Sequence, residues 1–296
     1  MIKSTVSASG AEIRPIRDGF VEEIRGLDLE APLSGDDEML LRASFARAGV
    51  VVIRNARPPS NEAHIAFARH FGHIGRAMTT ITGGPPPRIP YPEITDVSNL
   101  APDGSVLPAD SRRALFKRGD RLWHTDYSFV ANRATFSILA AHEVPPEGGD
   151  TEFADMRAAY RALSQEMRDR IAGLVAEHSI WHSRVLAGFP EPTQEELASQ
   201  PAVRHPLVHV HEGQPSLYIA SHAARIVGMD ETEGLALIRE LIERATQPEF
   251  VYRHAWQPGD LVIWDNLSTM HRATELVSED YRRDMRRVTL RERPVA

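Results

Sequence analysis

The run Leu122-Trp123-His124-Thr125-Asp126-Tyr127-Ser128-Phe129 contains the strongest clue to the fold of this chain. His124 and Asp126 stand two residues apart, and on an extended strand such residues point to the same side. A second imidazole, His271, follows a predicted strand at 260–264. Two imidazoles and one carboxylate are the ligand set that holds iron(II) on one face and leaves open positions for oxygen chemistry. We therefore predict a metal site formed by these three side chains.

The length and composition indicate one globular domain. The 296 residues show no repeat and no linker, so we expect a single domain over 1–296. A content of 42% apolar and 25% charged residues argues against disorder, and the net charge of −7 argues against nucleic acid as a partner. The absence of cysteine excludes disulfides and thiolate metal ligands. Without a signal peptide or a long apolar segment, we expect a cytoplasmic protein with no membrane contact, whose homo-oligomerisation stays open.

Hydrophobic periodicity predicts many short strands with inserted helices. Strands are expected at 49–53, 136–141, 151–153, 206–211, 217–220, 250–254, 260–264 and 285–290. Helices are expected at 36–48, at 61–71, twice within 155–174, after a capping box of Thr193 and Glu196, and at 230–246. This order favours a mainly β fold with inserted helices, a double-stranded β-helix or cupin-like jelly roll. No glycine-rich nucleotide-binding motif is present.

A long segment at 79–120 is rich in glycine and proline and ends where the His124 motif begins. Long irregular segments in compact domains are commonly binding loops or lids. We predict that 79–120 covers the active site.

Arg283 and Arg287 stand four residues apart with Met285 between them. On a strand they would share one face, and a buried, unpaired charge costs several kcal/mol. Each would then require an anion, and the planar guanidinium suits a carboxylate well. The alternative is that 282–287 is a solvated run of charges.

Several motifs in order give the chain a family resemblance. They are Trp123-His124-Thr125-Asp126, Gly148-Gly149-Asp150-Thr151, Trp264-Asp265-Asn266, Met270-His271-Arg272 and Arg283-Asp284-Met285-Arg286-Arg287. With them the chain resembles the iron(II)- and 2-oxoglutarate-dependent dioxygenases of the taurine dioxygenase group. The runs 151–160 and 245–254 are most similar to its 2,4-dichlorophenoxyacetate dioxygenase branch.

The resemblance implies a role for each matching residue. The iron ligands would be His124, Asp126 and His271. Thr151 and Arg283 would hold the distal carboxylate of 2-oxoglutarate, and Arg287 would hold the acidic group of the substrate. The backbone N–H of Tyr127 would be a second donor to that group. Tyr127 is also a departure, because the family has a smaller residue here, and its bulk leaves the exact substrate open.

The implied activity is hydroxylation of a small anionic substrate, with O2 consumed and succinate and CO2 released. An aryloxyalkanoate would be cleaved to a phenol and an oxoacid; a sulfonate such as taurine or another small carboxylate is the alternative. Iron(II) with Asp126 carries +1, two arginines raise this to +3, and 2-oxoglutarate leaves +1 for a singly charged substrate. Two rival classes remain, a zinc-type metallohydrolase and a non-catalytic 2-oxoglutarate-binding module.

Other histidines and polar residues have less specific patterns. His209 and His211 could form a second metal site, but we expect them to line the sheet or contact substrate. His178 and His182 are spaced for one helix face and have no carboxylate partner. We interpret three further histidines as ordinary surface or core residues: His64, His70 and His73. Asp265-Asn266 is expected to fix the turn before His271 or to orient the metal ligands.

Overall fold

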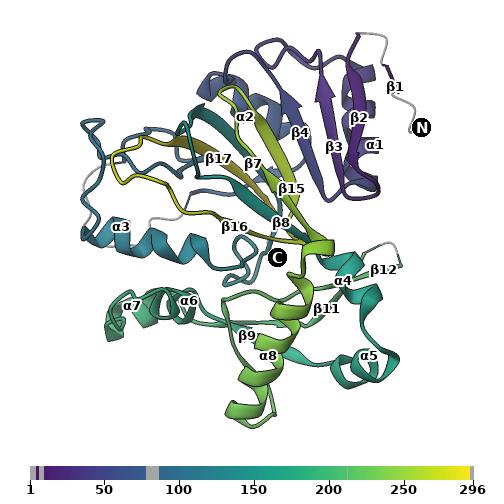
Figure 1. Ribbon diagram of the computed structural model, residues 1–296, viewed down its shortest axis with the longest axis vertical. Coiled ribbons are helices and arrows are strands. Elements are labelled where there is room, and N and C mark those ends of the chain that lie inside the picture. Colours follow the sequence, from purple (N-terminus) through teal and green to yellow (C-terminus); the bar gives the residue numbers. More distant parts are fainter. Residues whose placement is uncertain (1–4, 7–9, 78–86, 212, 294–296) are drawn as a thin grey trace.

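Two sheets packed face to face form the centre of the computed structural model, which describes residues 5–6, 10–77, 87–211 and 213–293 (Figure 1). In the described residues the large sheet has nine strands in the order β1-β2-β3-β4-β15-β7-β17-β5, with β6 also paired to β17. Its strands are β1 (Thr5–Val6), β2 (Glu12–Arg17), β3 (Val21–Arg25), β4 (Val50–Arg54), β5 (His73–Ile74), β6 (Ile94–Asp96), β7 (Ala134–Glu143), β15 (Leu261–Asp265) and β17 (Asp284–Arg291).

The opposing sheet has the strand order β14-β8-β16, and two smaller sheets lie beyond it. Its strands are β8 (Thr151–Asp155), β14 (Val251–His254) and β16 (Thr269–Ala273). The smaller sheets are formed by β9 (Val175–His178), β10 (Val203–Pro206) and β13 (Ala223–Ile226), and by β11 (Val208–His211) and β12 (Gln214–Leu217). This is the jelly roll predicted from the sequence.

Alternation along β4 shows how the layers are held together. Val50 and Val52 join the core between the two sheets, together with Phe153 of β8. Val51 and Ile53 point to the other face, into a core shared with the helices α1 (Gly35–Arg47) and α2 (Asn61–Arg69). Because successive side chains of a strand alternate in direction, one apolar run serves both cores.

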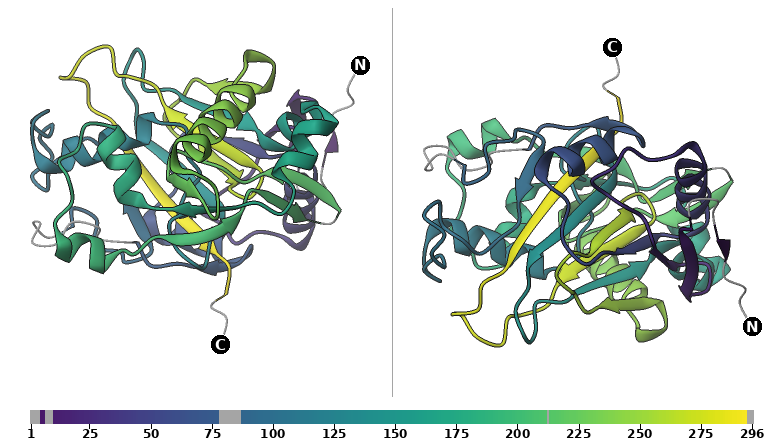
Figure 2. Two further views of the ribbon diagram at one scale, coloured as in Figure 1. Left: turned by 90° about the horizontal axis from the view of Figure 1, so that it is seen from below. Right: turned by 90° about the horizontal axis from the view of Figure 1, so that it is seen from above.

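The remaining helices lie mostly around the smaller sheets. They are α3 (Arg112–Lys117), α4 (Met156–Ala162), α5 (Gln165–Ile171), α6 (Ile180–Leu186), α7 (Gln194–Ser199) and α8 (Glu231–Ala245), with 3₁₀ turns η1 (Arg118–Arg121) and η2 (Pro248–Phe250). Figure 2 shows α8 lying across the strands when the molecule is seen from below. Its residues Leu237, Ile238 and Leu241 share a core with Met270 of β16. No helix of the described residues is both long and apolar enough to span a membrane.

The structure corrects several sequence expectations. The His124 motif is not a strand, because His124 forms one isolated bridge and a turn follows at 126–129. His178 lies in β9 and His182 in α6, so they do not share a helix. The described part of the predicted lid contains β6, α3 and η1, which the periodicity did not reveal; residues 78–86 lie outside the described residues.

Candidate metal centre

Two of the predicted ligands face each other across a backbone bridge. The N–H of His124 donates to the carbonyl of His271 at 2.9 Å, and the N–H of His271 donates back at 2.7 Å. His271 follows β15, as the sequence suggested, and lies within the next strand, β16. The chain turns at Asp126, and this turn brings the carboxylate toward the two rings. The predicted convergence is therefore achieved by a bridge and a turn instead of strand alternation.

Distances within this triad fit a small metal ion. Among the described residues, His124, Asp126 and His271 form the only group of three or more histidine and acidic side chains whose ligand atoms all lie within 4.8 Å of one another. Nε2 of His124 lies 3.9 Å from Oδ1 of Asp126, and Nε2 of His271 lies 3.8 Å from Oδ2. Donor atoms that each lie about 2.1 Å from one ion are about 3.0–3.4 Å apart, so a small inward movement of these side chains would let them share one ion. All three side chains are buried.

The protonation states also suit metal binding. Nδ1 of His124 lies 2.8 Å from the carbonyl of Leu122, and a proton on Nδ1 would leave the lone pair of Nε2 free to bind a metal ion. Burial, with the neighbouring His124, holds the pKa of His271 well below its usual value and favours neutral imidazole. Burial alone would raise the pKa of Asp126, but Arg287 and the two imidazoles lower it to about 2.

Asn266 forms hydrogen bonds that connect Asp126 of the triad with residues of β15 and β7. Its Oδ1 accepts from the N–H of Asp126 at 3.2 Å and from Nε1 of Trp264 at 3.0 Å. Its Nδ2 donates to Oγ of Ser137 at 3.0 Å, and Ser137 in turn donates to Oδ2 of Asp126 at 2.6 Å. Asn266 thus orients the carboxylate, whereas Asp265 accepts from the N–H of Leu267 and fixes the turn. Sequence reasoning missed Ser137, although a lone serine in an apolar strand was a signal.

Arg287 lies beside the triad. Its Nη1 donates to Oδ1 of Asp126 at 2.5 Å, and its guanidinium carbon lies 5.8 Å from the ring centre of Tyr127. Burial alone would lower the pKa of Arg287, but the Asp126 carboxylate and the nearby Tyr127 raise it. The arginine therefore stays charged next to the triad.

Arg283 is a buried cation without an ion pair among the described residues. It lies just before β17, and its Nη1 reaches only the carbonyl of Val97, at 3.4 Å. Burial lowers the pKa of Arg283 to about 10, with Asp120 and Asp150 acting in the opposite direction. Such a charge is costly unless an anion meets it. The solvated charge run considered as an alternative is therefore wrong for Arg283.

Thr151 begins β8, opposite Ala273 of β16, and is buried. Its Oγ1 accepts from Nε1 of Trp256 at 3.0 Å. The neighbouring Gly149 lies against the Arg283 side chain, since a Cβ added there would lie 3.5 Å from Cδ. Gly149, two residues before Thr151, thus lies next to the side chain of Arg283.

Tyr127 has a rare backbone conformation. Its φ is 54°, and no other non-glycine residue in the described part of the chain has a positive φ. The left-handed region costs about 1–2 kcal/mol for a residue with a Cβ, and such strain concentrates at functional sites. The buried ring stacks on Phe129 at 5.7 Å and covers the guanidinium of Arg291 at 3.8 Å. The departure noted in the sequence therefore lies directly beside Asp126.

Sequence reasoning also missed the pair of Asp120 and Arg184. Nη2 of Arg184 donates to Oδ1 of Asp120 at 3.0 Å, and Gly119 packs so closely that any side chain there would collide with the guanidinium. Arg184 is buried, and burial lowers its pKa. The pair connects α6 with the turn η1 that precedes His124, a connection that no local pattern reveals.

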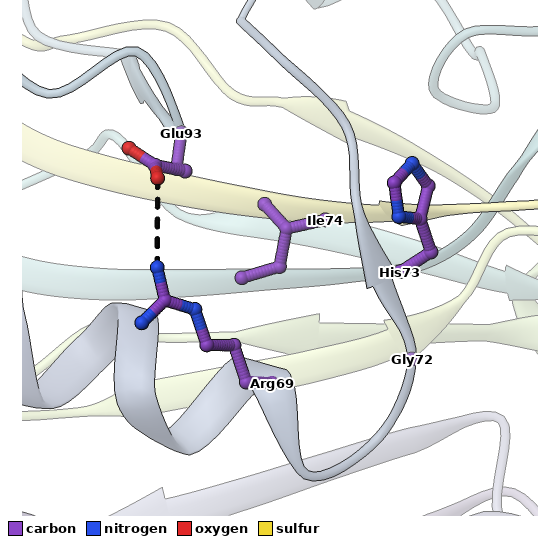
Figure 3. Close-up of a pocket in the computed structure, with 5 residues that line it drawn as sticks. All are labelled: Arg69, Gly72, His73, Ile74 and Glu93. Carbon is purple, nitrogen blue, oxygen red and sulfur yellow. Dashed lines mark ion pairs between the residues drawn. The ribbon is translucent and has the colours of Figure 1, made fainter.

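Other candidates lie apart from the triad. His209 and His211 lie on β11 with their rings stacked 6.4 Å apart, and they join no three-residue ligand cluster among the described residues. A surface pocket at the β5 edge is lined by Arg69, Gly72, His73, Ile74 and Glu93 (Figure 3). Arg69 and Glu93 face each other across it at 3.7 Å. No residue of the triad lines this pocket.

The sequence matches one known protein family and several dioxygenases. A family described as "Taurine catabolism dioxygenase TauD, TfdA family" matches residues 12–289. An alpha-ketoglutarate-dependent 2,4-dichlorophenoxyacetate dioxygenase of Burkholderia sp. (strain RASC) is 39% identical over 272 residues, which cover 91% of each chain. An (S)-phenoxypropionate/alpha-ketoglutarate-dioxygenase of Sphingobium herbicidovorans is 33% identical over 273 residues, or 89% of each chain.

The structure also resembles an experimental one. A crystal structure of AAD-2 in complex with Mn(II) and N-oxalylglycine matches with a TM-score of 0.91 and 42% identity. The match covers 97% of this chain and 98% of that chain.

Proposed function

The chain belongs to the TauD, TfdA family of dioxygenases, and from this premise we propose that it oxidises an aryloxyalkanoate. The fold, the dioxygenase class and the use of iron(II), 2-oxoglutarate and O2 follow from the family and its relatives. The aryloxyalkanoate is our proposal, and it is supported by relatives named for such substrates.

One observation carries the assignment of the site. A buried triad of two imidazoles and one carboxylate lies beside Arg287, with Arg283 unpaired among the described residues. We assign His124, Asp126 and His271 as the metal ligands. Iron(II) bound there would supply oxidation by O2 coupled to the decarboxylation of 2-oxoglutarate.

The anion-binding residues would orient both organic molecules. Arg283 and Thr151 would hold the distal carboxylate of 2-oxoglutarate, and Arg287 would hold the carboxylate of the substrate, with the Tyr127 N–H as a second donor. A hydroxyl placed on the carbon beside the ether oxygen gives a hemiacetal, which breaks down to a phenol and an oxoacid. We expect residues 79–120 to cover the site and the chain to act as one domain.

The test is product release across a panel of acids. With iron(II), ascorbate and 2-oxoglutarate, we expect phenoxyacetate to give phenol, glyoxylate and succinate in equal amounts. Taurine and simple carboxylates should give far less succinate. If taurine were the only acid in the panel that gave succinate, the aryloxyalkanoate assignment would be overturned. Phenol release without 2-oxoglutarate or O2 would favour a metallohydrolase. Binding of 2-oxoglutarate without turnover of any acid would indicate a binding module.

A further inference from the structure

The ring of Tyr127 contacts two arginines of one strand. Arg287 and Arg291 stand four residues apart on β17, and their guanidinium carbons lie 5.8 Å and 3.8 Å from the ring centre. Because both groups contact the same ring, they lie on the same side of the strand. They are separated by no more than the sum of these two distances.

Arg291 has no carboxylate partner among the described residues. Its Nη2 donates to the carbonyl of Arg76 at 3.2 Å, and its buried Nε has no partner in the described part of the chain. Gly75 packs against the same side chain, so that a Cβ there would lie 2.5 Å from Nε. This charge thus lies against an aromatic face, which attracts a cation.

The backbone of Tyr127 directs the ring to this place. A glycine would adopt the φ of 54° without strain, yet the chain has a tyrosine here, directly after Asp126. The ring is only 5% exposed and stacks on Phe129. The strained conformation is therefore linked to a ring that packs against Phe129 and two guanidinium groups.

We propose that Tyr127 is a specificity-determining residue that limits the chain length of the acid. Its ring holds Arg287 beside Asp126 and screens Arg291, so that the carboxylate of the substrate meets Arg287 alone. Arg287 contacts Asp126, whereas Arg291 contacts the ring and the carbonyl of Arg76. An acid that reached Arg291 would need more methylene groups between its carboxylate and its oxidised carbon. This inference rests on the proposed function.

Three variants test the screening role with phenoxyacetate and 4-phenoxybutyrate. Tyr127→Phe keeps the ring and should keep the preference for the shorter acid. Tyr127→Gly removes the ring without backbone strain, and it should shift the ratio of kcat/KM values toward 4-phenoxybutyrate by about tenfold or more, the scale of discrimination by methylene groups. Adding Arg291→Met to Tyr127→Gly should abolish that gain.

A merely structural ring would give a different result. Equal losses for both acids in Tyr127→Gly would overturn the proposal, and so would a gain that survives the loss of Arg291. Tyr127→Asn serves as the second variant if the glycine variant does not fold, because asparagine tolerates positive φ.

Binding separates this proposal from the proposed function. If the unaltered protein turns over neither acid, the aryloxyalkanoate assignment fails. Calorimetric Kd values for both acids, measured under nitrogen with protein loaded with Mn(II) and 2-oxoglutarate, then decide the role of Tyr127. A ratio that moves toward the longer acid in Tyr127→Gly supports the role, and an unchanged ratio overturns it.

Discussion

The guanidinium of Arg287 donates to Oδ1 of Asp126 at 2.5 Å, although 161 residues separate the two in the chain. The pair lies beside the imidazoles of His124 and His271, and the arginine helps to hold the pKa of Asp126 at about 2. One side chain therefore both keeps a metal ligand ionised and presents a cation to an incoming acid.

We expect Arg287→Met to raise the KM for phenoxyacetate far more than the KM for 2-oxoglutarate. Loss of one partner from a buried, hydrogen-bonded charge pair costs about 2–5 kcal/mol, which predicts an effect of about 30-fold or more. Arg286→Met is the matched control, because Arg286 binds Asn61 and Asp284 instead. Steady-state kinetics with both variants is the measurement, and similar effects in the two would point to damage to β17.

Arg283→Met should chiefly weaken 2-oxoglutarate. The buried guanidinium has no ion pair among the described residues, so an anionic ligand would be its main partner. We expect the KM for 2-oxoglutarate to rise by about 10- to 100-fold, with little change in the KM for the acid. Arg282→Met is the control, since exposed Arg282 pairs with Glu143. If Arg283→Met affected the acid and Arg287→Met affected 2-oxoglutarate, the two assignments would be reversed.

Asn266→Ala should weaken metal binding while the fold is kept. The amide holds the N–H of Asp126 and, through Ser137, its carboxylate. Loss of such an orienting partner typically costs 10- to 100-fold in metal affinity, so we expect about that change in the Kd for Mn(II). Calorimetry and circular dichroism are the measurements, with Asn132→Ala as a control outside this network. An unchanged Kd would show that the ligands need no help from Asn266.

His178→Phe should make the free energy of unfolding less dependent on pH. His178 is fully buried, neither ring nitrogen has a partner in the described part of the chain, and burial lowers its pKa to about 3. The unfolded chain binds a proton below about pH 6.5, whereas the folded chain does not until about pH 3. Stability linked to His178 is therefore fully present above pH 6.5 and falls as the pH falls.

Urea unfolding at pH 7.5 and pH 5 measures this effect. Between these values the unaltered protein should lose about 2 kcal/mol more stability than His178→Phe. The exposed His73→Phe is the control and should follow the unaltered protein. Parallel losses in all three proteins would refute the role of His178.

The clustering of His124, Asp126 and His271 and the order of the elements could be predicted from the sequence, but the local backbone conformation could not. Apolar periodicity predicted β4, α8 and β15, because burial determines where such residues lie. The left-handed conformation of Tyr127 could not be predicted, since residues with a Cβ avoid it unless distant contacts impose it. Strand β2 was missed because charged residues interrupt its apolar pattern.

Contacts between distant segments of the chain also could not be predicted from the sequence. Asp120 and Arg184 meet across 64 residues, and no spacing rule connects a 3₁₀ turn to a helix that far away. Ser137 was visible only as a polar residue in an apolar strand. Such residues come into contact only when the sheet forms, because they are far apart in the sequence.

The mutual hydrogen bonds between His124 and His271 set the spacing of two donors through the main chain itself. The backbone that carries the two imidazoles is therefore in place before any ion binds. Removal of the metal by a chelator should then leave the protein folded. The metal should rebind at the rate at which ions enter the site, with no slow rearrangement of the polypeptide.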